Sequence, residues 1–352
     1  MNDKKIRVVF AGTGGMGQAA HLKNYATNPE CEVVALAEIR EDVGKKVAAK
    51  YSIPKVYTDI GEMLKKEKFD AVVASQPFGR HGIILPEIMA YGKPVFTEKP
   101  IAGSIEVAEK VIAAAKKHKV MHMVGYHKRS DPAVAYAKAE IDSLKKSGEL
   151  GKMKYVRITM PAGDWIAEGF YDMLSGDNPK TKFEWDPPAK DMDKKHFDLY
   201  TAFVNYYIHQ VNLMRHLLGE KYSLTYADPS DVLIAGLSES KVPCSIEMSP
   251  YVTSIDWQES ALVCFEKGWI KIELPAPLTI NHPGKVTVFK DPGKGIVPLT
   301  VVPDLPWVSA MRQQAANFIK AVREGSKPLC DGEEALLDIK LAGDYMKLRY
   351  NV

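Results

Sequence analysis

Ile6–Gly17 reads IRVVFAGTGGMG, an apolar run rich in β-branched residues that leads directly into the pattern Gly12-x-Gly14-x-x-Gly17. The residues that follow, AAHLKNYA, predict a helix. A strand, a glycine turn and a helix in this order form the context in which the pattern predicts a dinucleotide-binding site. Gly12 permits the tight turn, Gly14 lets the backbone approach a pyrophosphate, and Gly17 lets the helix pack against the strand.

The next apolar run ends in an acidic residue. Glu32–Glu38 reads EVVALAE, and Glu38 lies about twenty residues past Gly17, where a carboxylate that binds the adenosine ribose belongs. Such a carboxylate accepts hydrogen bonds from both ribose hydroxyls and repels a 2′-phosphate, which favours NAD over NADP. Arg40 leaves the alternative open, because its guanidinium could stack on adenine or pair with a phosphate.

Composition narrows the class of protein. The 352 residues are enough for two domains, and 46% hydrophobic and 26% charged residues are typical of a soluble globular protein. A net charge of +3 gives no reason to expect nucleic acid or an acidic membrane surface as a partner. The N-terminal MNDKK leaves no room for a signal peptide, and no apolar stretch is long enough to span a bilayer. The scattered cysteines predict no disulfide, so we expect a cytoplasmic protein. They are Cys31, Cys244, Cys264 and Cys330.

Strand-like and helix-like runs alternate between Ile6 and Val124. This alternation predicts an α/β fold with a doubly wound parallel sheet, a Rossmann domain over residues 1–125, followed by a second α/β domain over 126–352. Ligands of such sheets bind outside the carboxyl ends of the strands. The loops at those ends are Gly12–Gly17, Glu38–Arg40, Ser75–His81, Glu98–Pro100 and Gly125–Arg129.

The second half has a different pattern. Pro161–Lys195 is long, irregular and rich in aromatic residues, which indicates an ordered surface that binds a ligand. Its aromatic residues include Trp165, Phe170, Tyr171, Phe183 and Trp185. Phe197–Leu218 predicts one helix, and the runs between Asp231 and Val302 predict a mostly antiparallel open sheet. Two closing helices are expected at Val308–Arg323 and Gly332–Leu348.

Lys99 lies in Glu98-Lys99-Pro100, at the predicted carboxyl end of a central strand. A lysine there can donate a hydrogen bond to a substrate hydroxyl or carbonyl oxygen, or take part in proton transfer if its pKa is lowered. The structural alternative is a solvated loop lysine that pairs with Glu98.

The motifs, taken in order, resemble the Gfo/Idh/MocA oxidoreductase family. They are AGTGGMG, Glu38, Gln76-Pro77-x-x-x-His81, Glu98-Lys99-Pro100 and Gly125-Tyr126-x-x-Arg129, with Asp331–Leu348 similar to the family's closing helix. The resemblance spans nearly the whole chain. It implies a Rossmann domain, a second α/β domain that binds substrate and often forms the homo-oligomer interface through its sheet, and hydride transfer between a nicotinamide cofactor and a sugar or polyol.

The resemblance also implies catalytic roles for Lys99, which matches the family's EKP lysine and contacts the reacting oxygen, and for His209, which matches the acid/base of a D-x-x-x-H signature. Here Asn205 stands in place of that aspartate. Residues four apart share one face of a continuous helix, so Asn205 and His209 are expected to reach the same cleft. Asn205 cannot stabilise an imidazolium as a carboxylate would. The alternatives are a purely structural His209 and a catalytic His196.

The remaining site predictions concern cofactor and substrate. We expect Tyr126, His127, Trp165, Asn205 and His209 to bind substrate, and no metal site. The predicted cofactor-binding residues are Gly12, Thr13, Gly14, Gly15, Met16, Gly17, Glu38, Arg40, Ser75, Gln76, Pro77, His81, Glu98 and Lys99.

The aromatic loop suggests a glycoside or sugar oxidised at a ring hydroxyl, the 3-position being the first choice. Two alternatives stay open. One is a redox-assisted glycoside hydrolase or lyase that recycles NAD within each turnover. The other is a non-catalytic dinucleotide-binding regulator, which the loss of the aspartate at position 205 keeps possible.

Overall fold

The computed structural model describes residues 4–177, 182–248 and 251–352. The chain divides into two compact units. The first comprises Met1–Tyr126, Gly169–Asp193 and Met311–Ile339, and the second comprises His127–Glu168, Lys194–Ala310 and Lys340–Val352. The assignment of cofactor binding to residues 1–125 and of substrate binding to residues 126–352 stays a prediction. The first compact unit also includes two segments from later in the chain.

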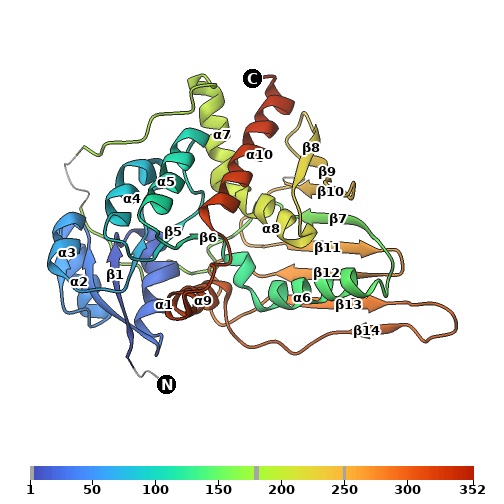
Figure 1. Cartoon of the computed structure of the whole chain (residues 1–352), viewed down its shortest axis with the longest axis horizontal. Coiled ribbons are helices and arrows are strands. Elements are labelled where there is room, and N and C mark those ends of the chain that lie inside the picture. Colours follow the sequence, from blue (N-terminus) through green and yellow to red (C-terminus); the bar gives the residue numbers. More distant parts are fainter. Residues whose placement is uncertain (1–3, 178–181, 249–250) are drawn as a thin grey trace. The chain divides into compact units, whose positions relative to one another are not determined.

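The first unit contains the predicted Rossmann sheet (Figure 1). Its six strands are parallel in the order β3-β2-β1-β4-β5-β6, which confirms the doubly wound α/β fold. The strand order reverses between β1 and β4, which is where doubly wound sheets bind ligands. The strands are β1 Ile6–Ala11, β2 Cys31–Ala37, β3 Val56–Tyr57, β4 Ala71–Ala74, β5 Val95–Glu98 and β6 His122–Gly125.

Helices connect these strands, as the alternation of strand-like and helix-like runs predicts. The helix after the glycine turn is a π-helical turn, Gly17–Leu22, that continues into α1, Lys23–Ala26. The π-helical turn was not expected, and such turns occur often at functional sites. The other helices of this part of the chain are α2 Glu41–Lys50, α3 Ile60–Lys66, α4 His81–Met89 and α5 Ile105–Lys117.

Aromatic packing builds the core of the first unit. Phe10 of β1, Tyr25 of α1 and Phe96 of β5 are fully buried. Phe318 of α9, Ala310–Glu324, packs its ring edge-to-face on Phe96 at a centroid distance of 5.7 Å. A helix from the C-terminal part of the chain therefore completes the core under the Rossmann sheet.

His122 makes the first unit sensitive to acid. The ring is buried in β6, its Nε2 lies 2.9 Å from the Thr97 hydroxyl, and burial lowers its pKa to about 3. The unfolded chain takes up this proton near pH 6.5, so between these values the unfolded state binds more protons. The free energy of unfolding therefore falls as pH falls through this window, by about 1.4 kcal/mol per pH unit for one histidine.

We expect His122→Gln to reduce that slope, because glutamine can still bond Thr97 and does not titrate. Urea unfolding at a series of pH values between about 6.5 and 3 measures it. His216 of the second unit, whose pKa burial also lowers to about 3, keeps part of the slope in the variant. An unchanged slope in the variant would contradict the assignment to His122.

The second unit contains an eight-stranded sheet in the order β14-β13-β12-β11-β7-β10-β9-β8. Among the strands of the described residues, β7 and β10 are the one pair that is parallel, which confirms the mostly antiparallel sheet. The helix α6, Pro132–Ser147, packs on β12 and β13. The strands are β7 Met153–Thr159, β8 Tyr222–Ala227, β9 Leu233–Ser238, β10 Pro243–Glu247, β11 Glu259–Phe265, β12 Gly268–Leu274, β13 Lys285–Lys290 and β14 Leu299–Val301. Strands β8 and β14 were not predicted.

The single helix predicted over Phe197–Leu218 is wrong. The structure has two helices, α7, Lys194–Tyr206, and α8, Ile208–Leu218, separated at Tyr207. The Tyr207 carbonyl accepts hydrogen bonds from the backbone N–H groups of Gln210 and Val211, so a new helix starts there. The Tyr207 hydroxyl donates to the Met248 carbonyl at 2.8 Å and anchors the break. The continuous helix that would place Asn205 and His209 on one face is absent from this described stretch.

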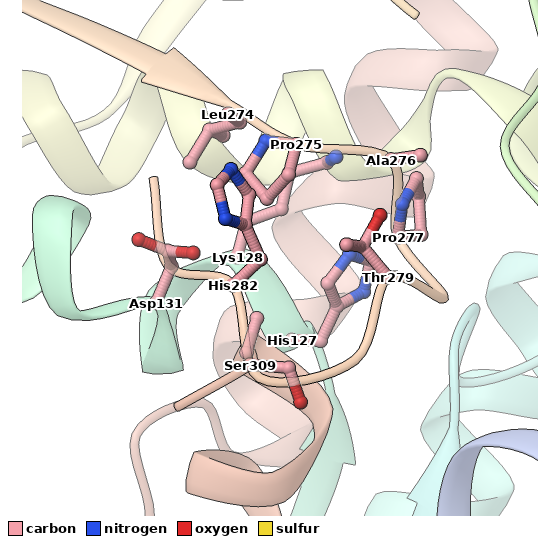
Figure 2. A pocket seen from close by; sticks show the side chains of 11 residues that line it. His127, Lys128, Asp131, Leu274, Pro275, Ala276, Pro277, Thr279, His282 and Ser309 are labelled. Carbon is pink, nitrogen blue, oxygen red and sulfur yellow. The ribbon is translucent and has the colours of Figure 1, made fainter. Parts of the chain in front are cut away.

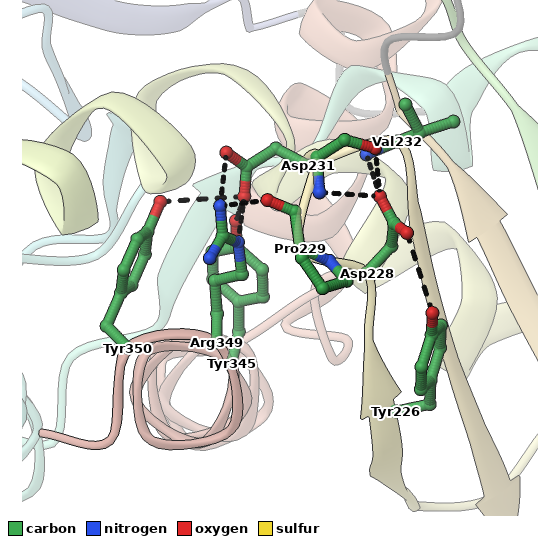
Figure 3. A network of polar contacts seen from close by, with 9 residues as sticks. Tyr226, Asp228, Pro229, Asp231, Val232, Tyr345, Arg349 and Tyr350 are labelled. Carbon is green, nitrogen blue, oxygen red and sulfur yellow. Dashed lines mark hydrogen bonds and ion pairs between the residues drawn. The ribbon is translucent and has the colours of Figure 1, made fainter.

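The closing helix α10, Gly332–Tyr350, is anchored near its C-terminal end (Figure 3). The Asp231 carboxylate accepts hydrogen bonds from the Tyr345 hydroxyl at 2.8 Å and from Arg349 Nε at 2.7 Å. Asp231 lies between β8 and β9, so this network fastens the helix to the edge of the second sheet. Among the helices in residues 4–177, 182–248 and 251–352, none is long and apolar enough to cross a membrane.

Candidate functional site

A pocket of about 740 Å³ opens in the first unit at the carboxyl ends of β1, β2, β3 and β4. This is the predicted end of the sheet, next to the reversal of strand order. Seven of the predicted cofactor-binding residues line the pocket: Gly12, Gly14, Glu38, Arg40, Ser75, Gln76 and Pro77.

The glycine turn is shaped for the close approach of a ligand. Gly12 has a φ of +99°, and a Cβ there would lie 2.4 Å from Gln76 Nε2 and 2.5 Å from the Ser75 carbonyl oxygen. A Cβ on Gly14 would meet no atom within 4 Å. Gly12 is therefore needed by the protein's own packing, whereas Gly14 leaves open space beside the backbone. That space fits the pyrophosphate of a dinucleotide.

Glu38 is held as a carboxylate at the pocket. Its Oε2 accepts hydrogen bonds from the Thr13 N–H at 3.1 Å and hydroxyl at 2.9 Å, and its Oε1 accepts from Arg40 Nε at 2.7 Å. Burial favours the neutral acid, but the hydrogen bonds from Arg40 and Thr13 outweigh it and keep the pKa of Glu38 below its ordinary value. The ionised oxygens suit ribose hydroxyls, and the pairing with Glu38 reduces the charge that Arg40 can offer to a phosphate.

Glu98 and His81 tie the neighbouring loops together. Glu98 Oε1 lies 2.6 Å from His21 Nε2, and its Oε2 accepts from the backbone N–H of half-buried Lys99 at 3.1 Å. His81 is buried, with Nδ1 2.9 Å from the Ile101 carbonyl and Nε2 3.3 Å from the Gln76 carbonyl. Burial lowers the pKa of His81, which keeps the ring neutral. His81 thus braces the loop after β4 against the segment after β5.

The second unit brings two of the predicted substrate-binding residues together. The rings of His127 and His209 meet edge-to-face with centroids 4.6 Å apart, and His127 is buried. His127 begins the 3₁₀ turn His127–Ser130, and His209 lies in the first turn of α8. Asn205 is exposed on α7, and the rival His196 has its ring centroid 6.0 Å from that of Tyr350.

Polar contacts behind the two rings join the same two elements. Lys128 Nζ donates to the buried Glu259 carboxylate at 2.5 Å, and Gln210 Nε2 donates to its other oxygen at 2.8 Å. Arg129 Nε donates to Asn212 Oδ1 at 2.7 Å. The residues that follow His127 are therefore bonded, directly or through Glu259, to residues that follow His209, and this fixes how the imidazoles meet.

A small hollow in the second unit borders His127 (Figure 2). Asp131 forms part of its wall, and the carboxylate caps α6 by accepting from the Ala133 N–H at 2.8 Å. Burial raises the pKa of Asp131. The hollow therefore offers polar groups beside His127. Its other polar lining side chains are Lys128, Thr279, His282 and Ser309.

Comparison with known proteins identifies the first unit. Residues 6–126 match the GFO_IDH_MocA family, described as an oxidoreductase family with an NAD-binding Rossmann fold. This part of the chain belongs to the Gfo/Idh/MocA oxidoreductases. The protein is therefore an oxidoreductase that uses a nicotinamide cofactor, and the pocket at Gly12, Gly14 and Glu38 is the candidate site for it.

Relatives and solved structures extend the likeness along the chain. Scyllo-inositol 2-dehydrogenase (NAD(+)) of Bacillus subtilis is 29% identical over 96% of this chain and 92% of that protein. Myo-inositol 2-dehydrogenase of Thermotoga maritima is 23% identical over 64% of this chain and 58% of that one. A putative NADPH-dependent oxidoreductase of Desulfitobacterium hafniense has the same fold, with a TM-score of 0.77, 14% identity and coverage of 99% and 96%.

The pocket lining also contains residues that were not predicted to bind cofactor, among them two aromatic residues of the long loop. Phe183 and Trp185 line the pocket of the first unit, although the sequence suggested a substrate surface for their loop. Trp165, from the same loop, lies in the second unit, and Tyr126 is buried in the first. The sequence shows that the loop is rich in aromatic residues. It does not show which pocket they line, because that depends on the tertiary contacts of the loop. Residues 178–181 of this loop lie outside the described residues. Within the described ranges, no group of three or more His, Cys, Asp or Glu residues is arranged to hold a metal ion.

Proposed function

We propose that this oxidoreductase transfers a hydride between NAD and a hydroxyl-bearing carbon of a sugar or polyol. The observation that carries the proposal is the pocket that pairs an open Gly14 turn with an ionised Glu38. The alignment with a scyllo-inositol dehydrogenase over 96% of the chain supports the substrate class.

The proposed chemistry assigns a role to each group. When bound, NAD supplies the hydride acceptor, and the protein binds and orients the reactants. The pyrophosphate lies against the backbone at Gly14, and the Glu38 carboxylate accepts hydrogen bonds from the ribose hydroxyls. Lys99 donates a hydrogen bond to the reacting oxygen and stabilises the charge that develops there. His209 takes the hydroxyl proton, and the His127 ring, 4.6 Å away between centroids, restricts its orientation.

A substrate screen followed by nicotinamide absorbance tests the proposal. Scyllo-inositol, myo-inositol, glucose and an aryl glucoside should be offered with NAD and, separately, with NADP. We expect NAD to be reduced with at least one polyol or sugar, and more slowly with NADP because Glu38 repels a 2′-phosphate. Absence of turnover with every polyol and sugar in either direction, by a protein that binds NADH, would favour the regulator instead.

The finer proposal is oxidation of a glycoside at the 3-position, with Trp165 against the sugar or its aglycone. Mapping of the oxidised carbon by NMR decides the position. Trp165→Ala should raise KM for an aryl glucoside more than KM for inositol, since aromatic rings stack on sugar C–H faces. Equal changes for both substrates would remove the argument for a glycoside.

We further propose a homo-oligomer formed through the second sheet. Along β11, buried Ala261 and Val263 alternate with partly exposed Leu262, and Trp269 and Phe289 stack on neighbouring strands at 5.7 Å. Light scattering of the purified protein measures the oligomer number. The cytoplasmic location also stays a proposal, and fractionation of the native cell would test it.

A further inference from the structure

The NAD pocket has an aromatic wall that comes from outside the Rossmann strand–helix units. Phe183 and Trp185 line the pocket together with Arg80. Their side chains are 37% and 57% exposed, so ring surface remains available to a ligand. The Arg80 guanidinium lies 4.4 Å from the centroid of the Phe183 ring, which orients that ring.

Backbone contacts fix this wall on the loop after β4. Arg80 Nε donates to the Glu184 carbonyl at 3.0 Å, and the Asp186 N–H donates to the Gly79 carbonyl at 2.7 Å. The Asp186 carboxylate accepts from the Gly82 N–H at 2.8 Å and so caps α4. Trp185 packs so close to Gly79 that a Cβ there would lie 3.2 Å from its ring. These contacts hold residues 183–186 in place on the loop after β4, so that Phe183 and Trp185 line the pocket.

An earlier part of the same loop, residues 170–174, contacts the glycine turn and the helix that follows it. The Gln18 side chain donates to the Leu174 carbonyl and accepts from the Leu174 N–H, each at 2.9 Å. A Cβ on Gly15 would come within 3.8 Å of Phe170 and Met173. Residues 170–174 thus lie against the glycine turn, and residues 183–186 lie against the loop after β4.

We propose that Arg80, Phe183 and Trp185 bind the adenine of NAD and make its release slow enough for the cofactor to stay bound between turnovers. The inference deepens the proposed function and rests on it for the dinucleotide. Adenine presents a flat π-face, and stacking of a base on aromatic side chains is sequence-tolerant and strong. Phe183 and Trp185 line the same pocket as Glu38 and Arg40, the residues proposed to bind the adenosine ribose, so the base would meet the aromatic rings there.

The test measures NADH dissociation by stopped-flow fluorescence, with excess NAD as the displacing ligand. Trp185→Ala and Phe183→Ala should each raise koff about tenfold or more, the loss expected from removing one base–aromatic stack. Trp185→Phe should restore most of the slow release. Trp307→Ala, which removes an 82% exposed tryptophan of the second unit, is the matched control and should leave koff unchanged.

Reduced nicotinamide mononucleotide, which lacks the adenosine half, separates adenine binding from a general loosening of the pocket. Its koff should be the same in wild type and Trp185→Ala. A twofold or smaller change in NADH koff in both alanine variants, with unchanged melting temperatures, would overturn the inference, as would equal increases for the mononucleotide. The proposed function fails separately, if wild type releases NADH slowly yet oxidises no polyol or sugar.

Discussion

Replacement of Lys99 by methionine is expected to lower kcat by about 10²–10³-fold, the usual effect of removing one donor that stabilises a developing oxygen charge. Methionine preserves the length of the side chain but has no donor. The backbone N–H of Lys99 still bonds Glu98 at 3.1 Å in this variant, so the fold of the loop is retained. NADH affinity should stay within about twofold, because Lys99, although predicted to bind cofactor, is not among the residues that line the pocket of Gly14 and Glu38.

Steady-state kinetics and NADH titration measure the two quantities on the same preparation. Lys117→Met, on the exposed last turn of α5, serves as the matched control and should keep full kcat. Lys99→Arg tests position, since a guanidinium retains the charge with a different geometry and should restore little activity. Wild-type kcat in Lys99→Met would exclude Lys99 from the reaction.

The Rossmann unit was predictable because its signals are local. The six strands and the helices between them appear in the sequence as periodic apolar runs. Gly12 and Gly14 directly follow the first of these strands and Glu38 directly follows the second, so their positions could be read from the sequence. Strand β14 escaped prediction because it has only three residues, and β8 because its residues are half exposed and lack a clear apolar run. Their pairing with β13 and β9 creates them.

The helix break at Tyr207 was not predictable for a related reason. Phe197–Leu218 has helical spacing throughout, and no Pro or Gly marks residue 207. The anchor is a hydrogen bond from Tyr207 to the Met248 carbonyl, 41 residues away in sequence. Sequence spacing therefore wrongly placed Asn205 beside His209, and it did not predict the contact between the His127 and His209 rings.

The position of Phe183 and Trp185 in the pocket lining was also not predictable from local sequence. Trp185 and Gly79 lie more than a hundred residues apart, and the loop leaves a strand of the second unit before it returns to the first. That the loop binds a ligand stays a prediction, and the structure shows that two of its aromatic residues line a pocket. Which pocket it lines depends on tertiary contacts such as Asp186 on the N-terminus of α4, and no local pattern encodes these.

Gly14→Val is expected to weaken NAD binding by roughly 10- to 150-fold without lowering the melting temperature. The added side chain would point into space where no protein atom lies within 4 Å, so the fold has no contact to lose. The valine side chain would keep the pyrophosphate away from the backbone, and the charge-assisted hydrogen bonds lost in this way are worth about 1.5–3 kcal/mol. This free energy corresponds to the roughly 10- to 150-fold loss of affinity. Titration of NADH fluorescence and thermal unfolding measure both effects.

Gly12→Val is the matched variant with the opposite stability signature. Its Cβ would lie 2.5 Å from the Ser75 carbonyl oxygen, at a φ of +99° that side chains rarely adopt, so the backbone must shift. We expect this variant to lose stability by about 1–3 kcal/mol in addition to losing NAD. The two variants are compared because a turn that is destabilised loses NAD whether or not the pyrophosphate contacts it. Gly14→Val keeps the turn intact, so a loss of affinity in this variant reports the contact itself. Native NAD affinity in Gly14→Val would mean that the pyrophosphate does not approach the chain at this glycine.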